Sequence, residues 1–167
     1  MDLVVFLNTI YIAFDRIVAE SKCYKVETIG DCYVVSSGVP LRNGHEHAWE
    51  VCTLAIDFLR TARTVALPND HINRAAARIG INSGPIAAGV IGTRMPHYCL
   101  FGDAMNTASR MESHGYVDKI HVSPSTKNLV VVHSPNLDKY FTTRGTIQVK
   151  GKGQLTTYWL LESPLNW

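Results

Sequence analysis

Residues 98–112 join a short apolar run to a polar, helix-like segment, and this connection constrains the fold more than any other part of the sequence. The run at 98–101 predicts a buried strand, and Gly102 permits a tight exit from it. Asp103 is a candidate N-cap for a helix that ends near residue 112. The chain therefore contains a buried strand that leads directly into a helix with a polar face.

Two polar residues of that helix, Asn106 and Arg110, are four positions apart and share one face. An amide and a guanidinium on one face could both address one anionic group. Arg suits phosphate because its planar fork donates hydrogen bonds in pairs and stays charged. The same spacing also fits a solvated pair on an exposed helix face, so both interpretations stay open at this point.

The rest of the chain alternates helical and β-prone stretches. Apolar residues at three- and four-residue spacing predict amphipathic helices over 3–19 and 45–65, and a short helix capped by Ser123 precedes a loop near Pro135. The inner face of the second helix is made of small residues and leucine: Ala48, Cys52, Ala55, Leu59 and Ala62. Strands are expected at 24–30, 31–37, 75–83, 86–91, 119–122, 140–149 and 156–161.

Two turns carry charged residues whose role the sequence alone leaves open. Gly30 and Asp31 join two β-prone runs, which puts Glu27 on a strand and Asp31 at a hairpin tip. A carboxylate at a hairpin tip is most often an ordinary turn former, and the alternative for Asp31 is an oxygen ligand for a hard divalent cation. In the turn at 150–153, Lys150 fits a soluble turn, while the neighbouring glycines would also let a phosphate approach closely.

Composition excludes several classes of protein. The chain has 167 residues, which fits a single domain, and its formal charge of +2 gives no bulk signal for a nucleic-acid partner. Four cysteines without Cys-x-x-Cys spacing are typical of a reduced, cytosolic domain. No apolar run approaches the roughly 20 residues of a membrane span, so we expect no direct membrane contact from this segment.

Five blocks taken together resemble the class III nucleotidyl cyclase catalytic domain, and more narrowly the eukaryotic guanylyl cyclases. The blocks are residues 25–31, 78–84, 94–103, 106–113 and 149–153. They follow one another in the family's order through essentially the whole chain. The resemblance implies an α+β fold derived from the ferredoxin-like fold, with a mostly antiparallel central sheet packed by helices, in a single domain over 1–167.

The resemblance also implies an activity in signal transduction. Two cyclase domains bind GTP at their interface and close it into cyclic 3′,5′-GMP with release of pyrophosphate. Two divalent ions per site, Mg²⁺ or Mn²⁺, assist the reaction. We expect a homodimer in the cytoplasm, with a heterodimer as the other arrangement open to this family.

Individual roles follow from positions that match the family's motifs. Asp31 matches one of two aspartates that hold the metal ions. Asn106 and Arg110 match residues that the other protomer contributes to orient the ribose and to stabilise charge on the transferring phosphoryl group. Lys150 matches a lysine that binds the outer phosphates.

Base recognition is implied by Glu27 and Cys99, because adenine-specific members of the family have Lys and Asp at these two positions. Guanine offers an N1 hydrogen and an exocyclic amine, which a carboxylate accepts well, and an O6 acceptor that a thiol can meet. Adenine would leave Glu27 facing a lone pair in a buried site, at a cost of about 1–3 kcal/mol. The pair therefore predicts guanine.

The sequence departs from the family pattern at its start, where members carry the first metal aspartate on a strand before the first long helix. The chain begins inside or just before that helix, so we expect the first core strand and one metal aspartate to be missing and the 167 residues alone to be nearly inactive. The alternatives are a non-catalytic pseudo-cyclase that serves dimerisation or regulation and, more weakly, an adenylyl cyclase with unusual base contacts.

Overall fold

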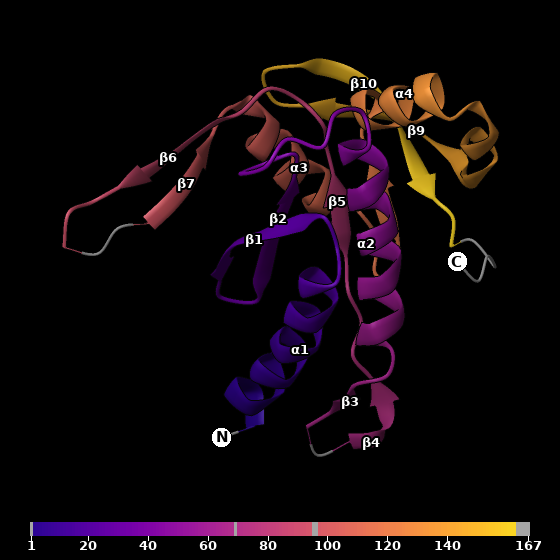
Figure 1. Ribbon diagram of the computed structural model, residues 1–167. Coiled ribbons are helices and arrows are strands. Elements are labelled where there is room, and N and C mark those ends of the chain that lie inside the picture. The colour runs from indigo at the N-terminus through magenta and orange to yellow at the C-terminus, as the bar shows by residue number, and fades with distance from the viewer. Residues whose placement is uncertain (1, 69, 95–96, 163–167) are drawn as a thin grey trace. The chain divides into compact units, whose positions relative to one another are not determined.

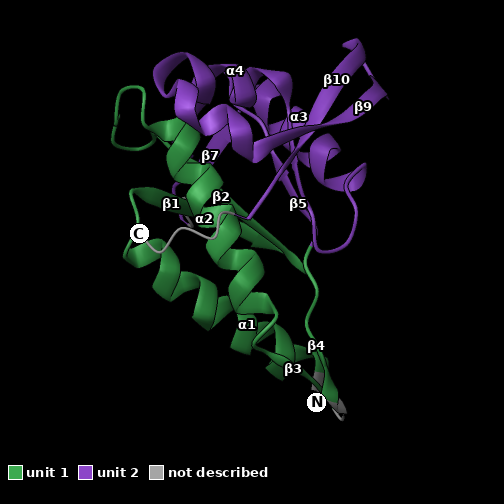
Figure 2. Cartoon of the chain, turned by 90° about the vertical axis from the view of Figure 1, so that its right-hand side faces the viewer, with its two compact units in different colours: residues 1–77 green, residues 78–167 purple. Residues whose placement is uncertain are grey.

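The chain divides into two compact units, which Figure 2 colours separately and which are described here one at a time: residues 1–77 and residues 78–167. The computed structural model describes residues 2–68, 70–94 and 97–162. Both units combine helices with short sheets (Figure 1), which confirms the mixed α and β composition that the sequence predicts.

Two helices form the framework of the first unit. They are α1 (Asp2–Ala19) and α2 (His47–Ala62), and both agree with the helices expected from apolar spacing. They pack through Phe14 and Phe58, whose rings stack with centroids 4.1 Å apart. All five residues predicted for the inner face of α2 are buried, which confirms that its small residues allow close packing.

The first unit also contains two hairpins. Strands β1 (Cys23–Ile29) and β2 (Cys32–Ser37) pair antiparallel across a two-residue turn, and Gly30 adopts a left-handed conformation there with φ of 60°. This confirms the hairpin expected at Gly30 and Asp31. A second, short hairpin of β3 (Ala66–Leu67) and β4 (Asp70–Arg74) was not expected from the sequence.

The core of the second unit is a four-stranded sheet in the order β5-β8-β10-β9. Its strands are β5 (Ile79–Ile81), β8 (Ile120–Val122), β9 (Phe141–Val149) and β10 (Gly153–Leu160). Among the described strands, only β5 and β8 pair in parallel, so the prediction of mostly antiparallel pairing is confirmed. The strand expected over 75–83 is wrong outside β5, because residues 75–78 and 82–83 make no ladder.

The second unit also contains three helical segments. Helix α3 (Asp103–Ser113) packs along β5, and α4 (Pro124–His133) begins at Ser123, whose side chain accepts a hydrogen bond from the Thr126 amide. That capping confirms the prediction for Ser123. The loop expected near Pro135 is instead a 3-10 helix at Pro135–Tyr140.

The remaining part of the second unit is a two-stranded ribbon of β6 (Ala87–Ile91) and β7 (His97–Phe101). Figure 1 shows it extending away from α3 and from the four-stranded sheet of its own unit. None of the described helices is long and apolar enough to cross a membrane.

Candidate active site

Glu27 and Asp31 lie on the same hairpin of the first unit, and a β-bulge determines where Glu27 points. Lys25 is opposite Val35 whereas Glu27 is opposite Val34, so Val26 is an extra residue in β1. Neighbouring residues of β2 face opposite sides, and therefore Lys25 and Glu27 do too. Without the bulge, Lys25 and Glu27 would face the same side of the strand. The Glu27 side chain is exposed.

The opposite face of the hairpin is bound to α1. The Asp15 carboxylate accepts hydrogen bonds from Lys25 Nζ at 2.7 Å and from the Tyr33 hydroxyl at 2.5 Å. Burial alone would raise the pKa of Asp15, but these two hydrogen bonds outweigh it and lower that pKa. Glu27 lies on the other face of the hairpin and does not take part in these contacts with Asp15.

The hairpin tip that carries Asp31 is also attached to α1. The Tyr11 hydroxyl donates to the Gly30 carbonyl at 2.6 Å. Burial, and next the charge of Asp31, raise the pKa of Tyr11. Sequence reasoning missed Tyr11 and Asp15. In the periodic pattern of a helix, Tyr11 indicates only a core aromatic residue and Asp15 only a solvated carboxylate.

The second unit brings two of the sequence blocks together. The Arg110 guanidinium on α3 donates to the Lys150 carbonyl in the turn between β9 and β10, and the Lys152 ammonium pairs with the Asp103 carboxylate at the start of α3. Arg110 is half-buried, and Asn106 is exposed one turn before it. The contacts therefore attach the turn between β9 and β10 to both ends of α3, through Lys152 at its start and through the Lys150 carbonyl near its end.

Asp103 is not the N-cap of α3, which corrects the expectation from the sequence. The N-cap is Gly102, with φ of 140°, and no side chain caps the helix. A Cβ at Gly102 would lie 3.1 Å from the Pro85 carbonyl, so glycine suits this position. Asp103 becomes the first helical residue, where its carboxylate pairs with Lys152 and is favoured by the helix dipole.

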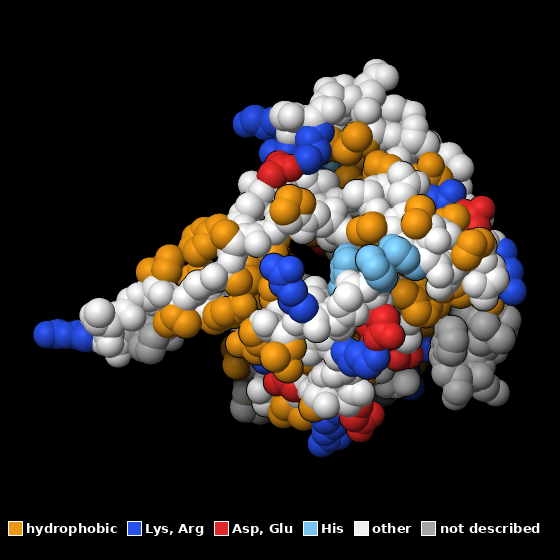
Figure 3. Space-filling model, turned by 45° about the horizontal axis from the view of Figure 1, so that its top comes forward, with side chains coloured by type: hydrophobic (Ala, Val, Ile, Leu, Met, Phe, Trp, Pro, Cys, Tyr) orange, Lys and Arg blue, Asp and Glu red, His pale blue; other side chains and the backbone are white. Residues whose placement is uncertain are grey.

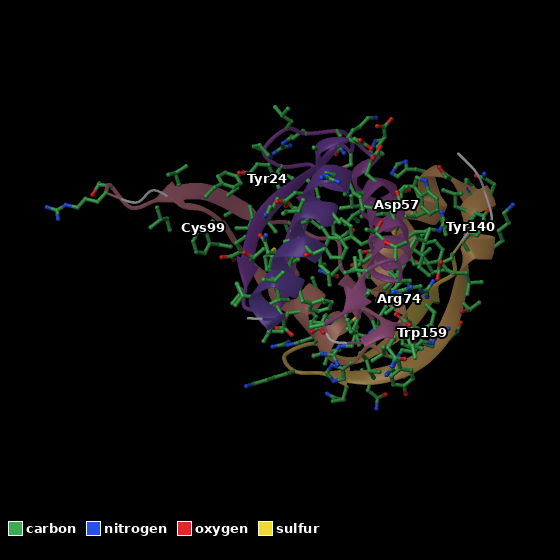
Figure 4. All side chains as sticks on the ribbon, turned by 90° about the horizontal axis from the view of Figure 1, so that it is seen from below. Tyr24, Asp57, Arg74, Cys99, Tyr140 and Trp159 are labelled. Carbon is green, nitrogen blue, oxygen red and sulfur yellow. The ribbon has the colours of Figure 1, made fainter. Side chains whose placement is uncertain are left out.

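Cys99 lies on the ribbon, opposite Gly89, and is half-buried. Figure 4 shows its side chain on the ribbon, apart from Trp159 on β10 and from Tyr140. Residues 95 and 96, which belong to the same sequence block, lie outside the described residues. Glu27 and Cys99 belong to different units, so their meeting around one base remains a prediction.

The metal assignment rests on Asp31. Within 2–68, 70–94 and 97–162, no group of three or more His, Cys, Asp or Glu side chains is close enough to hold a metal ion. Asp31 is exposed at a hairpin tip and offers carboxylate oxygens, the donors that Mg²⁺ and Mn²⁺ prefer. The chain thus fits a divalent ion through one carboxylate ligand, and further ligands would have to come from outside this hairpin.

The fold and these clusters define a class III nucleotidyl cyclase domain. The model of the adenylate and guanylate cyclase catalytic domain matches residues 1–162. The chain belongs to this family.

Known relatives and solved structures agree with that membership. Guanylyl cyclase C of Rattus norvegicus is 48% identical over 160 residues, which cover 96% of this chain and 15% of the relative. The guanylate cyclase domain of RhGC from Catenaria anguillulae in complex with GTP is 38% identical, with a TM-score of 0.82 over 95% of this chain and 83% of that one. A non-canonical dimeric guanylyl cyclase domain of the RhoGC fusion protein from Blastocladiella emersonii is 37% identical, with a TM-score of 0.79 over 96% and 83%. The chain thus spans about 15% of the length of the curated relatives that it matches.

Proposed function

We propose that this chain is part of a guanylyl cyclase that converts GTP to cyclic 3′,5′-GMP and pyrophosphate. The observation that carries the proposal is the contact of Arg110 with the turn at Lys150, which joins the two blocks to which the family resemblance gives phosphoryl-transfer roles. The identity to guanylyl cyclase C and the likeness to a structure in complex with GTP support the choice of substrate class.

In the proposed reaction the ribose 3′-oxygen forms a bond to the α-phosphorus, and the bond from that phosphorus to the β-phosphate bridging oxygen breaks. Pyrophosphate leaves, and the 3′-hydroxyl proton passes to solvent. Asn106 orients the ribose, Arg110 donates to the phosphoryl oxygens as their charge develops, and Lys150 holds the outer phosphates. Asp31, together with further ligands, would hold divalent ions, which would supply charge neutralisation of the triphosphate and activation of the hydroxyl.

Guanine selection is assigned to Glu27 and Cys99. The bulge in β1 supports this assignment for Glu27, because it turns the carboxylate to the face opposite the one that Asp15 engages. Glu27 then accepts from the guanine N1 hydrogen and the exocyclic amine, and the Cys99 thiol meets O6.

The proposed active form is a cytoplasmic homodimer in which Asp31 and Arg110 of one site come from different protomers. Val90, Ile91 and Phe101 of the ribbon are exposed large apolar side chains, which favours a protein partner for this surface. One structure of the similar Blastocladiella domain is a non-canonical dimer, and another structure of that domain is monomeric. A heterodimer would use the same surface with a different chain.

Nucleotide preference tests the proposal directly. The natural polypeptide that carries these residues is assayed with Mn²⁺ and either GTP or ATP, as wild type and as Glu27→Lys with Cys99→Asp. We expect GTP turnover in the wild type and a shift of preference toward ATP by at least about 100-fold in the double variant, because both proposed base contacts change. Glu20→Lys, an equal charge change at an exposed position, is the control and should leave the preference unchanged.

The other outcomes separate the alternatives. GTP binding without turnover in the wild type would favour a pseudo-cyclase, and ATP turnover in the wild type would favour an adenylyl cyclase. The 167 residues alone are expected to turn over GTP only slowly, because Asp31 is the one residue in this sequence that matches the family's metal aspartates.

A further inference from the structure

A buried histidine connects helix α3 to the sheet beneath it. His121 on β8 is completely inaccessible to solvent. Its Nδ1 lies 2.6 Å from the Met111 carbonyl of α3, and its Nε2 lies 2.7 Å from the Thr157 hydroxyl of β10. One imidazole thus joins three elements, and the residue next to Met111 in the chain is Arg110.

The Met111 carbonyl is one of the last in its helix, where carbonyl groups lose their intrahelical partners. The Gly115 amide, four positions on, donates to Glu112 instead at 2.9 Å, and the His114 amide donates to Arg110 at 3.0 Å. His121 therefore provides the hydrogen bond that the helix cannot supply to a buried acceptor.

The contacts determine the protonation of the imidazole. A carbonyl can only accept, so Nδ1 carries the hydrogen, and in the neutral ring Nε2 then accepts from the Thr157 hydroxyl. That hydroxyl has one proton. It lies closer to Nε2, at 2.7 Å, than to the Gly145 carbonyl at 3.2 Å, so the proton points to the imidazole. Burial lowers the pKa of His121, which agrees with a neutral ring.

The same face of the sheet brings β5 into direct backbone contact with α3, because Gly80 is the register partner of His121 in the parallel pair β5 and β8. A Cβ at Gly80 would lie 2.0 Å from the Glu112 amide nitrogen and 2.6 Å from the Ala108 carbonyl oxygen. The backbones of β5 and α3 are therefore in direct contact at the middle and at the end of the helix. The end of the helix is also held by the ion pair of Arg78 with Glu112 and by the hydrogen bond from Arg144 to the His114 carbonyl, both of which are exposed. The bond from His121 to Met111 is buried.

We propose that His121 is a positioning residue for Arg110. It fixes the last turn of α3 and so holds the guanidinium of Arg110, one residue before Met111, in the position needed for phosphoryl transfer. His121 does not touch substrate. The inference rests on the proposed role of Arg110, and a small displacement of a positioned group is enough to slow a reaction by as much as 100-fold.

Two half-conservative variants test the inference in the natural polypeptide. In His121→Asn the amide nitrogen can take the position of Nδ1 and still donate to Met111, whereas in His121→Gln the amide reaches toward Thr157. We expect kcat for GTP to stay within about threefold of wild type in the Asn variant and to fall roughly 10- to 100-fold in the Gln variant, with KM nearly unchanged in both. Thr157→Val, which removes the other partner of His121 with little change of shape, should resemble the Asn variant.

Hydrogen exchange supplies a second measurement that needs no turnover. Amides at the end of α3 should exchange faster in His121→Gln than in His121→Asn when both are compared at equal stability. Equal losses of kcat that follow the melting temperature, together with equal exchange, would overturn the positioning role. Absence of GTP turnover in the wild type would contradict the proposed function instead, and the exchange result would still decide whether His121 fixes the helix.

Discussion

Helix α3 and the β6–β7 ribbon belong to the same unit but are built in opposite ways. The helix is fixed by backbone contact at Gly80 and by the buried His121, and its Met111 side chain is fully buried. The ribbon has exposed apolar side chains on its strands, which Figure 3 shows as orange patches on the projecting arm. Each element carries residues proposed for the site, Arg110 on the helix and Cys99 on the ribbon.

The difference indicates which part of the site the chain can complete by itself. The residues proposed for phosphoryl transfer include Asn106 and Arg110 on α3, which contacts β5, β7 and β8 of its own unit. Cys99, which we propose to contact the base, lies on a ribbon whose exposed apolar side chains favour a protein partner. Under the proposed function, the residues on α3 are preorganised by their own unit, whereas the residue on the ribbon depends on assembly.

A matched pair of glycine variants tests the contrast between α3 and the ribbon, because it adds a methyl group next to each of them. Gly80→Ala should reduce the free energy of unfolding by about 3 kcal/mol or more, because the new Cβ would overlap the backbone of α3. Gly89→Ala on the ribbon should change it by less than about 1 kcal/mol, because nothing lies within 4 Å of a Cβ there. Denaturant titration measures both values, and similar losses would contradict the description of α3 as tightly seated.

Removing the apolar surface of the ribbon should affect assembly more than folding. Val90→Ser with Phe101→Ser is expected to raise the dissociation constant of the dimer by at least about tenfold, while the stability of the monomer changes by less than about 1 kcal/mol. Sedimentation velocity over a concentration series measures the first effect. Val132→Ser, an equally exposed residue on α4, is the control, and weakening by that variant to the same extent would remove the ribbon from the interface.

The stability that the contacts of His121 with α3 contribute should depend on pH. Burial, and next the charges of Arg144 and His114, lower the pKa of His121 below 6.5, opposed by the bond to Met111. Because the unfolded chain then binds more protons, stability is complete above about pH 6.5 and decreases as pH falls toward the folded pKa, by at most about 1.4 kcal/mol per pH unit. Chemical unfolding of wild type and His121→Asn at several pH values isolates this slope, and identical slopes would contradict a neutral buried ring.

Periodicity predicted most of the fold because it reports which face of an element is buried. The inner face of α2, the hairpin at Gly30 and the cap at Ser123 are local features, and each is confirmed. The cap expected at Asp103 is wrong because Lys152, 49 positions later in the chain, takes that carboxylate. Distant partners of this kind leave no mark on a local pattern.

The site was predicted in its residue types and only partly in its arrangement. The contact between α3 and the turn at Lys150 joins two blocks that the sequence could relate only through the family. The bulge at Val26 could not be predicted, since one extra residue reverses the face of Glu27 without changing composition. His121 could not be found either, because a buried histidine in an apolar strand has the same local sequence whether or not it holds a helix.

Complementation between two inactive variants tests most directly whether one site is shared by two protomers. Asp31→Ala and Arg110→Ala in the natural polypeptide should each abolish cyclic GMP formation from GTP. An equimolar mixture that exchanges subunits should recover about one quarter of the wild-type rate, because half of the dimers are mixed and each mixed dimer has one intact site. Recovery near that level is the result we predict. A mixture no more active than its components, with mixed dimers demonstrated, would contradict the shared site.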